Sequence, residues 1–283
     1  MWLNFHTHSN FCDGKSTLEE MVEKAKSLKM KWLGFSSHAP LPFDCLWSMK
    51  PESLNDYLNK IVTLKNLSTD LQIYSGLEID YIPSITGPEK FSDKLDYTIG
   101  SIHFVETFDD GRRWEIDGPH SFFLEGLGKI FSNNIKDAII RYFELTREMI
   151  EQSRPTIVGH LDKIKMQNIS SKFFLEDATW YKFEIDRTLD CIEKSESIVE
   201  VNTRGIYQNK TSTTYPSPWI LERILEKKIP ITLSSDAHHC NDLINHFYET
   251  AIQLKQIGFH KIHILHDGHW RPFKFNEHGI EIE

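Results

Sequence analysis

The chain alternates between short runs of apolar, β-branched or aromatic residues and longer segments in which apolar residues recur every three or four positions. The short runs predict buried strands at residues 2–6, 32–38, 71–80, 97–103, 156–160, 198–203, 231–238 and 261–265. The longer segments predict helices at residues 17–28, 51–67, 135–152, 177–194, 217–227 and 241–257. Strands that alternate with helices favour an α/β fold with one parallel sheet covered by helices. At 283 residues, closure of that sheet into a barrel is favoured over an open sheet.

Two segments depart from this alternation. Residues 104–134 form a polar insertion that is rich in aromatic and acidic residues, and residues 266–283 form a C-terminal extension. The chain shows neither an internal repeat nor a break that resembles a linker. We therefore expect a single domain over residues 1–283, with the insertion placed over the active site.

Composition narrows the range of partners. The net charge of −9 argues against a nucleic-acid partner, because nucleic-acid binding requires a basic face. A small anionic substrate remains compatible with this charge if bound cations reverse the local field. No apolar run approaches the length of about 20 residues that spans a bilayer, so no membrane partner is expected. The four cysteines are scattered without a CxxC pair, which is typical of a reduced, cytoplasmic protein. The sequence does not define an oligomeric state.

Ionisable side chains mark the ends of the predicted strands. These side chains are His6, His38, Glu78, His103, His160, Asp236 and His238. In a (β/α) barrel, the carboxyl ends of the strands share one rim, so these groups would converge there. His8 lies two positions after His6, and an extended chain places such a pair on one side. Asp236 and His238 repeat this spacing.

A convergence of this kind predicts a metal site. Burying many ionisable groups without a counter-charge costs several kcal/mol for each ion, and divalent cations offset that cost. Imidazole and carboxylate ligands without thiolates are typical of Zn, Fe or Mn in an open hydrolytic site.

Seven motifs in order resemble those of the polymerase and histidinol phosphatase (PHP) superfamily. They read HTHSNFCDG, SSHAP, GLEIDY, GSIH, GHLDKIK, EVNTRG and SSDAH, and they run through almost the whole chain. Together, GLEIDY, GSIHF and GHLDKIK at this chain length resemble the monofunctional histidinol-phosphatase branch. The resemblance implies a distorted (β/α)7 barrel, similar to a TIM barrel, with a three-metal cluster on its C-terminal rim.

The resemblance also implies a role for each ligand. His6, His8 and Asp236 would hold the first metal, which Glu78 would bridge to a second. His103 and His160 would complete the second metal's ligands, and the third would be held by Asp13, His38 and His238. The implied reaction is hydrolysis of L-histidinol phosphate to L-histidinol and phosphate in histidine biosynthesis. We expect attack by a metal-bound hydroxide without a phospho-enzyme, so no side-chain nucleophile is required.

Candidates for substrate contacts are fewer. Arg204 follows a strand, and its guanidinium matches phosphate in two parallel hydrogen bonds. Lys163 and His239 are further candidates, and Lys165 lies in the same motif as Lys163. Substrate selection is expected to involve the 104–134 insertion and the loop at 39–50.

Other functions fit parts of this pattern. Another phosphoesterase of the superfamily would act on phosphotyrosine, nucleotides, DNA ends or a broad range of monoesters. A metal-dependent amide or lactone hydrolase is a further alternative, although the sequence offers no clear strand-end candidate for the bridging or carboxylated lysine typical of that class. A metal sensor or storage protein would bind ions without catalysis, but an open site with several metals argues against it.

Overall fold

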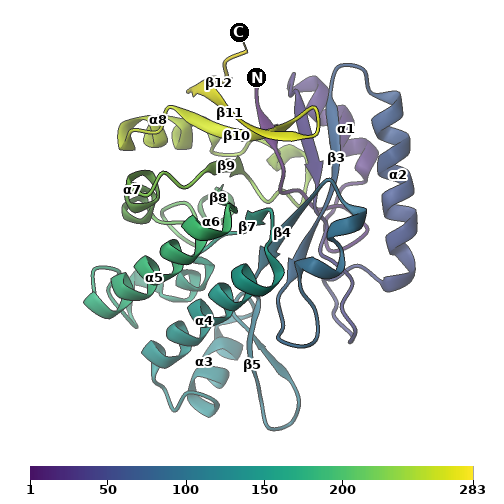
Figure 1. Cartoon of the computed structure of the whole chain (residues 1–283). Coiled ribbons are helices and arrows are strands. Elements are labelled where there is room, and N and C mark those ends of the chain that lie inside the picture. The colour runs from purple at the N-terminus through teal and green to yellow at the C-terminus, as the bar shows by residue number, and fades with distance from the viewer. Residues whose placement is uncertain (283) are drawn as a thin grey trace.

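The computed structural model describes residues 1–282 and forms a distorted (β/α)7 barrel (Figure 1). Its parallel sheet runs in the order β1-β2-β3-β4-β7-β8-β9. The bounds are β1 (Leu3–Asn4), β2 (Trp32–Phe35), β3 (Gln72–Asp80), β4 (Tyr97–Ser101), β7 (Ile157–Val158), β8 (Ile198–Asn202) and β9 (Ile231–Ser234). A parallel bridge between Thr7 and Ala237 joins the two edges beyond β1 and β9. The predicted fold class is therefore confirmed.

Helices surround the barrel (Figure 1). Those that connect or follow barrel strands are α1 (Leu18–Ser27), α2 (Leu54–Leu67), α4 (Ile135–Ser153), α5 (Thr179–Ser195), α6 (Arg204–Tyr207), α7 (Pro218–Glu226) and α8 (Phe247–Ile257). The start of α1 illustrates the local signal: Thr17 accepts from the backbone N–H of Glu20, while the Glu20 carboxylate accepts from that of Thr17. Short 3₁₀ helices include Pro51–Ser53, directly before α2, and Lys163–Gln167, after β7.

Aromatic side chains fill the barrel interior. The Tyr97 hydroxyl donates to the backbone carbonyl oxygens of Phe5 at 2.6 Å and Phe35 at 3.2 Å. Gly34 makes room for this ring, because a Cβ there would lie 2.3 Å from the Tyr97 hydroxyl oxygen. These contacts join the segment directly after β1 to β2 and β4.

The 104–134 segment builds a small substructure at one end of the barrel. β5 (Phe104–Thr107) and β6 (Arg113–Glu115) form an antiparallel hairpin, followed by α3 (His120–Lys129). Trp114 is fully buried against Phe123 and Phe131, so the hairpin is anchored to α3 and the segment after it. Figure 1 shows the hairpin and α3 at the end of the molecule opposite the two chain termini.

The C-terminal strands cover the other end. β10 (Lys261–His266), β11 (His269–Asn276) and β12 (Gly279–Ile280) form a separate antiparallel sheet. Its Trp270 ring packs 5.0 Å from the ring of Phe5 inside the barrel. The strand expected at 261–265 therefore exists but lies outside the barrel, and the C-terminal extension continues its sheet.

One further expectation needs correction, and two of the observed helices were not expected. The helix expected at 241–257 begins only at Phe247, because His246 adopts a left-handed conformation with φ of 60° and interrupts the helical path. The helices α3 and α6 were not expected.

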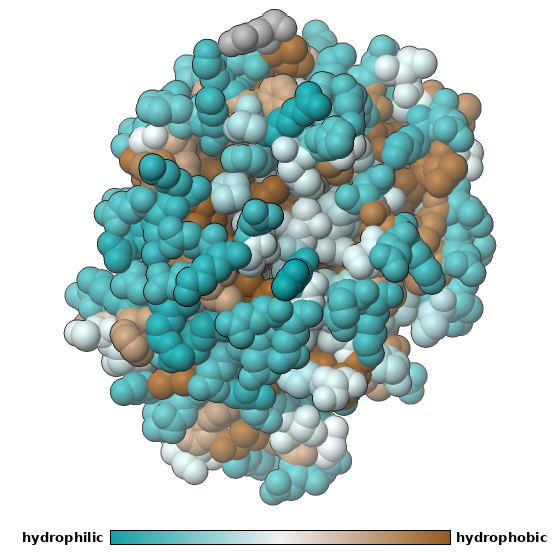
Figure 2. Space-filling view, in the orientation of Figure 1, coloured by the Kyte–Doolittle hydropathy of each residue, from teal (hydrophilic) through white to brown (hydrophobic). Residues whose placement is uncertain are grey.

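The surface of the face seen in Figure 1 is mainly hydrophilic, with hydrophobic residues in scattered groups (Figure 2). Within residues 1–282, no helix combines the length and the apolar character needed to cross a bilayer.

Candidate metal centre

All nine predicted metal ligands come together beside the carboxyl ends of the barrel strands. Eight are buried or nearly so, and Asp13, in the loop after β1, keeps about a third of its side chain exposed. They belong to overlapping groups of three or four residues, and within each group the ligand atoms lie within 4.8 Å of one another. The nine residues are His6, His8, Asp13, His38, Glu78, His103, His160, Asp236 and His238. Segments far apart in sequence thus supply one centre.

The first group contains His6, His8 and Asp236, with Glu78 beside them. The Nε2 atoms of His6 and His8 lie 3.1 Å apart. Glu78 Oε2 lies 3.2 Å from His6 Nε2, and Asp236 Oδ1 lies 3.2 Å from His8 Nε2. Two ring nitrogens and two carboxylate oxygens therefore face a common point.

The second group shares Glu78 with the first. Its Oε1 lies 2.8 Å from His160 Nε2 and 3.5 Å from His103 Nε2. The Ser101 hydroxyl donates to the same Oε1 at 2.7 Å, which fixes the carboxylate. Because Oε2 faces the first group and Oε1 the second, Glu78 has the geometry of a bridging ligand.

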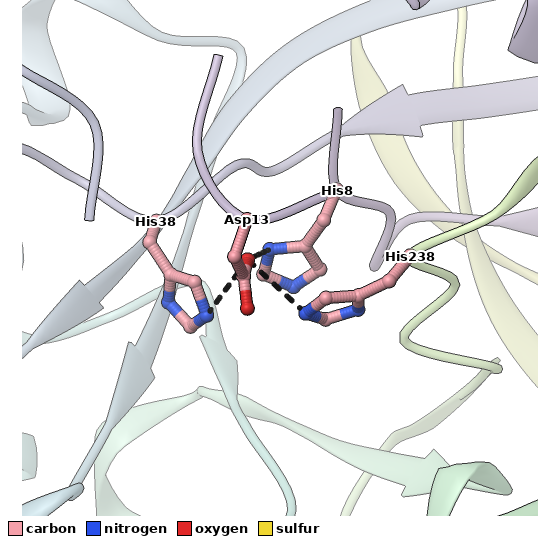
Figure 3. A group of neighbouring side chains, drawn as sticks. All are labelled: His8, Asp13, His38 and His238. Atoms are coloured by element: carbon pink, nitrogen blue, oxygen red, sulfur yellow. Dashed lines mark ion pairs between the residues drawn. The ribbon is translucent and has the colours of Figure 1, made fainter. Parts of the chain in front are cut away.

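The third group surrounds Asp13 (Figure 3). Asp13 Oδ1 lies 3.3 Å from His238 Nε2 and 3.9 Å from His38 Nε2. His8 also belongs here, because its Nδ1 lies 4.0 Å from the same oxygen. The sequence placed His8 in the first group alone, whereas the structure turns its two ring nitrogens toward two groups.

Glu200 and Asp80 support this centre, and sequence reasoning missed both. Glu200 Oε1 lies 2.6 Å from His6 Nδ1, and Glu200 Oε2 accepts from the backbone N–H of His160 at 2.7 Å. Asp80 Oδ1 lies 3.0 Å from His103 Nδ1. Carboxylates that hold the far nitrogen of an imidazole orient the ring and leave Nε2 free for a metal.

Both residues carried a signal in the sequence. Glu200 is an acid within the apolar run SIVEVN, and Asp80 lies two positions after Glu78. Residues two apart in a strand share a face, so Asp80 was a candidate on spacing alone.

The electrostatics of the centre suit metal ligation. Burial alone would raise the pKa of Glu78, but the imidazoles of His6, His38 and His103 outweigh it and hold this pKa well below its usual range. Burial lowers the pKa of His38 to about 4, despite the opposing charge of Glu78. Burial, together with His238 and His38, also holds the pKa of His8 well below normal. Despite burial, Glu200 raises the pKa of His6 well above normal, and Asp80 raises that of His103 to about 9. The site thus offers ionised carboxylates and, at His8 and His38, neutral imidazoles, the forms that bind metals.

Hydrogen bonding leaves some of these atoms without partners. Within residues 1–282, Asp236 Oδ1 and His38 Nδ1 are buried and make no hydrogen bond, although they lie 3.2 Å from His8 Nε2 and 3.1 Å from Glu78 Oε2, respectively. Burying a polar atom destabilises the folded state unless a hydrogen-bond partner or a bound ion compensates for the lost contact with water. The donor set and its convergence therefore fit divalent metal ions.

A cavity of about 250 Å³ adjoins the centre. It is lined by proposed ligands and by Trp47, Glu115, Asp117, Gly118, Lys163 and Arg204. Arg204 Nη1 donates to the backbone carbonyl oxygen of Asp236 at 2.8 Å and lies 2.7 Å from His238 Nδ1. Lys163 Nζ lies 3.0 Å from Asp117 Oδ2 and 3.1 Å from His103 Nε2. Two of the predicted substrate contacts thus lie at the cavity.

The other two candidates lie elsewhere. His239 Nδ1 accepts from the backbone N–H of Asn241, so the His239 side chain caps the 3₁₀ turn Cys240–Asp242. Lys165 is buried and donates to Asp162 at 2.9 Å and to the Ser217 hydroxyl at 2.5 Å. Lys165 therefore joins the loop after β7 to the start of α7 and does not face the cavity.

Comparison with known proteins adds a second line of evidence. The PHP domain family matches residues 4–204. A histidinol-phosphatase of Bacillus subtilis is 27% identical over 267 residues, which cover 88% of this chain and 97% of that protein. A crystal structure of a proposed histidinol phosphatase from Listeria monocytogenes superposes with a TM-score of 0.75 at 25% identity, covering 88% of this chain and 99% of the other. The histidinol phosphate phosphatase of Lactococcus lactis, solved with zinc, L-histidinol and phosphate, has a TM-score of 0.66 at 18% identity, covering 99% of each chain.

Proposed function

The chain belongs to the PHP domain family, and from this premise we propose that it hydrolyses L-histidinol phosphate to L-histidinol and phosphate. One observation carries the proposal: nine histidine, aspartate and glutamate side chains meet beside the strand ends, in a chain similar over most of its length to a histidinol-phosphatase. The protein is on this basis a metal-dependent phosphate-monoester hydrolase of histidine biosynthesis.

Three divalent ions, of zinc, iron or manganese, are proposed as cofactors. The nitrogen and oxygen donors, without a thiolate, support this choice of metals. His6, His8 and Asp236 would hold one ion, and His103 and His160 a second, with Glu78 between them. Asp13, His38 and His238 would hold the third.

The chain's own residues prepare the site for phosphoryl chemistry. When bound, such ions lower the pKa of water and neutralise charge on phosphoryl oxygens. Glu200 and Asp80 orient the rings of His6 and His103, as their short distances to Nδ1 indicate. Arg204 and Lys163 add positive charge to the cavity wall, where a phosphate group would lie. Catalysis by this arrangement needs no side-chain nucleophile and no phospho-enzyme.

A phosphate-release assay on a panel of monoesters tests the proposed function. The panel contains L-histidinol phosphate, phosphotyrosine, a nucleoside monophosphate and p-nitrophenyl phosphate, each measured with metal-loaded and chelator-treated protein. We expect kcat/KM for L-histidinol phosphate to exceed that for p-nitrophenyl phosphate by orders of magnitude, and to vanish after chelation. Equal and weak rates across the panel would instead indicate a general phosphoesterase.

We also propose a reducing compartment, the cytoplasm, as the place of action. The four cysteines are free thiols, and each is only partly buried, which supports this assignment.

A further inference from the structure

Glu115 differs from the other carboxylates that line the catalytic cavity. We propose that Glu115 binds the ammonium group of the substrate and selects aminoalkyl phosphates over monoesters without a positive charge. This inference rests on the proposed function, because L-histidinol phosphate carries an amino group on the carbon next to its ester carbon.

The hairpin places Glu115 beside the metal centre. Glu115 pairs in register with Phe104, the residue directly after His103. The backbone N–H of Ile116 donates to the carbonyl oxygen of His103 at 2.9 Å. Since neighbouring side chains of a strand point to opposite faces, the burial of Trp114 in the core directs Glu115 toward the cavity.

The Glu115 carboxylate is held by neutral groups. Its Oε2 accepts from Trp47 Nε1 at 3.2 Å. Its Oε1 lies close to Gly118, where an added Cβ would be 3.0 Å away. The Trp47 ring in turn packs 4.6 Å from the ring of His38 and stacks on Phe104. The carboxylate is thus fixed in place at the cavity wall.

The part of the chain that the structure describes provides no positive partner for this charge. Within residues 1–282, no lysine, arginine or histidine nitrogen lies within the 4.0 Å of an ion pair with Glu115, whereas Asp117 pairs with Lys163 at 3.0 Å. Burial raises the pKa of Glu115, and the negative charge of Asp117 raises it further. The proposed ligands Glu78 and Asp236 show the opposite shift, because imidazoles surround them.

An unpaired carboxylate opposes the binding of a simple phosphate ester. Two negative groups in a confined cavity repel each other, so Glu115 disfavours any dianion that brings no positive charge. A substrate with an ammonium group converts that repulsion into an ion pair with a charge-assisted hydrogen bond. Discrimination of this kind uses attraction for one ligand and repulsion for its competitors.

The surrounding space also suits a longer substrate. Glu115 and Trp47 line the catalytic cavity and also a second hollow of about 520 Å³, whose wall includes Phe43, Phe104 and Phe122. A phosphate at the metal centre would leave the rest of the molecule near Glu115, with room for a ring beyond it.

Glu115→Gln in the metal-loaded enzyme tests this role. The glutamine carbonyl can still accept from Trp47, so the variant removes the charge and keeps the contact. Steady-state kinetics are measured with L-histidinol phosphate and with its desamino analogue, an imidazolylpropyl phosphate. We expect kcat/KM for L-histidinol phosphate to fall roughly 10- to 100-fold, mainly through KM, as for loss of a charged hydrogen bond. For the desamino analogue it should stay unchanged or rise.

Asp109→Asn is the matched control, because Asp109 lies exposed in the turn of the same hairpin. It should leave both substrates unaffected. An equal loss with both substrates in Glu115→Gln, or no loss with either, would overturn the inference while leaving the proposed function intact. The same holds if the wild-type enzyme hydrolyses the desamino analogue as well as L-histidinol phosphate. Wild-type activity on p-nitrophenyl phosphate alone would overturn the proposed function, and this inference with it.

Discussion

At the residue scale, each imidazole of the centre must present a nitrogen lone pair to a metal and hold its proton elsewhere. Glu200 and Asp80 meet this requirement for His6 and His103, since each carboxylate lies within hydrogen-bond distance of Nδ1. Glu200 further accepts from the backbone of His160 and from the Asn202 side chain, so one buried carboxylate organises two strand ends. The centre therefore depends on residues that would not touch a metal.

Replacing Glu200 with Gln should weaken metal binding without unfolding the protein. The glutamine preserves the side-chain volume, but its neutral amide no longer favours the proton on His6 Nδ1. Loss of such a partner typically lowers metal affinity or activity about 10- to 100-fold. Metal titration of the chelator-treated protein, followed by elemental analysis and phosphate release, measures this change.

The exposed Glu222→Gln, on α7, is the control for Glu200→Gln. It should bind metal as the wild type does. Full metal content and full activity in Glu200→Gln would mean that the carboxylate plays no part in orienting His6.

The residues proposed as metal ligands could be identified because strand ends are visible in the sequence, and because His, Asp and Glu seldom gather there in such numbers for another purpose. The supporting carboxylates could not, because their role depends on which ring lies opposite them across the barrel. The double use of His8 depends on the ring's orientation, which spacing along the chain does not define. Glu115 was covered only by the description of the insertion as rich in acidic residues, since its lack of a cationic partner within residues 1–282 is a tertiary property.

At the scale of elements, the β5–β6 hairpin and α3 decide where Glu115 lies. The indole ring of Trp114 lies directly over Gly126 of α3, where an added Cβ would come within 2.1 Å of the indole Cδ1. The helix and the hairpin can approach this closely only because position 126 has no side chain. The placement of Glu115 therefore depends on a glycine in another element.

Gly126→Ala should displace Trp114 and the hairpin with it. Overpacking of this kind costs about 1–3 kcal/mol, and we expect the free energy of unfolding to fall by that amount. The KM for L-histidinol phosphate should rise, because the hairpin carries Glu115. Urea denaturation and steady-state kinetics measure the two effects.

Gly128→Ala, two positions along the same helix, gives the comparison. Outside the backbone of its own helix, a Cβ at position 128 has one neighbour within 4 Å among residues 1–282, the Asn133 side chain at 3.4 Å. Alanine should therefore stabilise the helix there by about 0.5–1 kcal/mol, with unchanged kinetics. Equal effects of the two substitutions would show that Trp114 does not depend on the space at Gly126.

Most elements were predicted within a few residues, and the exceptions have physical reasons. The helix 135–152 is observed as Ile135–Ser153, because its apolar face repeats over five turns. The hairpin strands of the insertion were not resolved from the sequence because each is only three or four residues long and partly polar. The prediction of a helix at 241–257 was wrong for its first part, because helix propensity does not reveal the left-handed turn at His246.

At the scale of the whole molecule, the two ends of the barrel have different tasks. The carboxyl ends of the strands carry the metal centre, and the β10–β12 sheet packs Trp270 against Phe5 and Tyr97 toward the other end. The run at 261–265 reads as a strand like the seven of the barrel, so periodicity could not exclude it from the barrel. Its place follows instead from the local hairpin that it forms with β11 across Asp267 and Gly268, which the periodicity of a single strand does not reveal.

The metal centre also links strands from all parts of the barrel, so metal binding should stabilise the entire fold. Ligands on the loops after β1, β2, β4, β7 and β9 come together only in the folded chain, and ions that bind there stabilise it by mass action. At a free metal concentration about 100 times the dissociation constant, one occupied site raises the free energy of unfolding by about 2.7 kcal/mol. For a chain of 283 residues with an unfolding entropy of about 2.1 cal/mol/K per residue, this corresponds to a rise in Tm of about 4–5 °C.

Differential scanning calorimetry of chelator-treated protein across a series of zinc or manganese concentrations measures this rise. Potassium chloride at matched ionic strength controls for screening, and Asp236→Asn should reduce the metal-dependent part, because it removes the charge of a carboxylate at the first group. A Tm that does not respond to metal in the wild type would contradict binding at the centre, since no ligand that prefers the folded state can leave its stability unchanged.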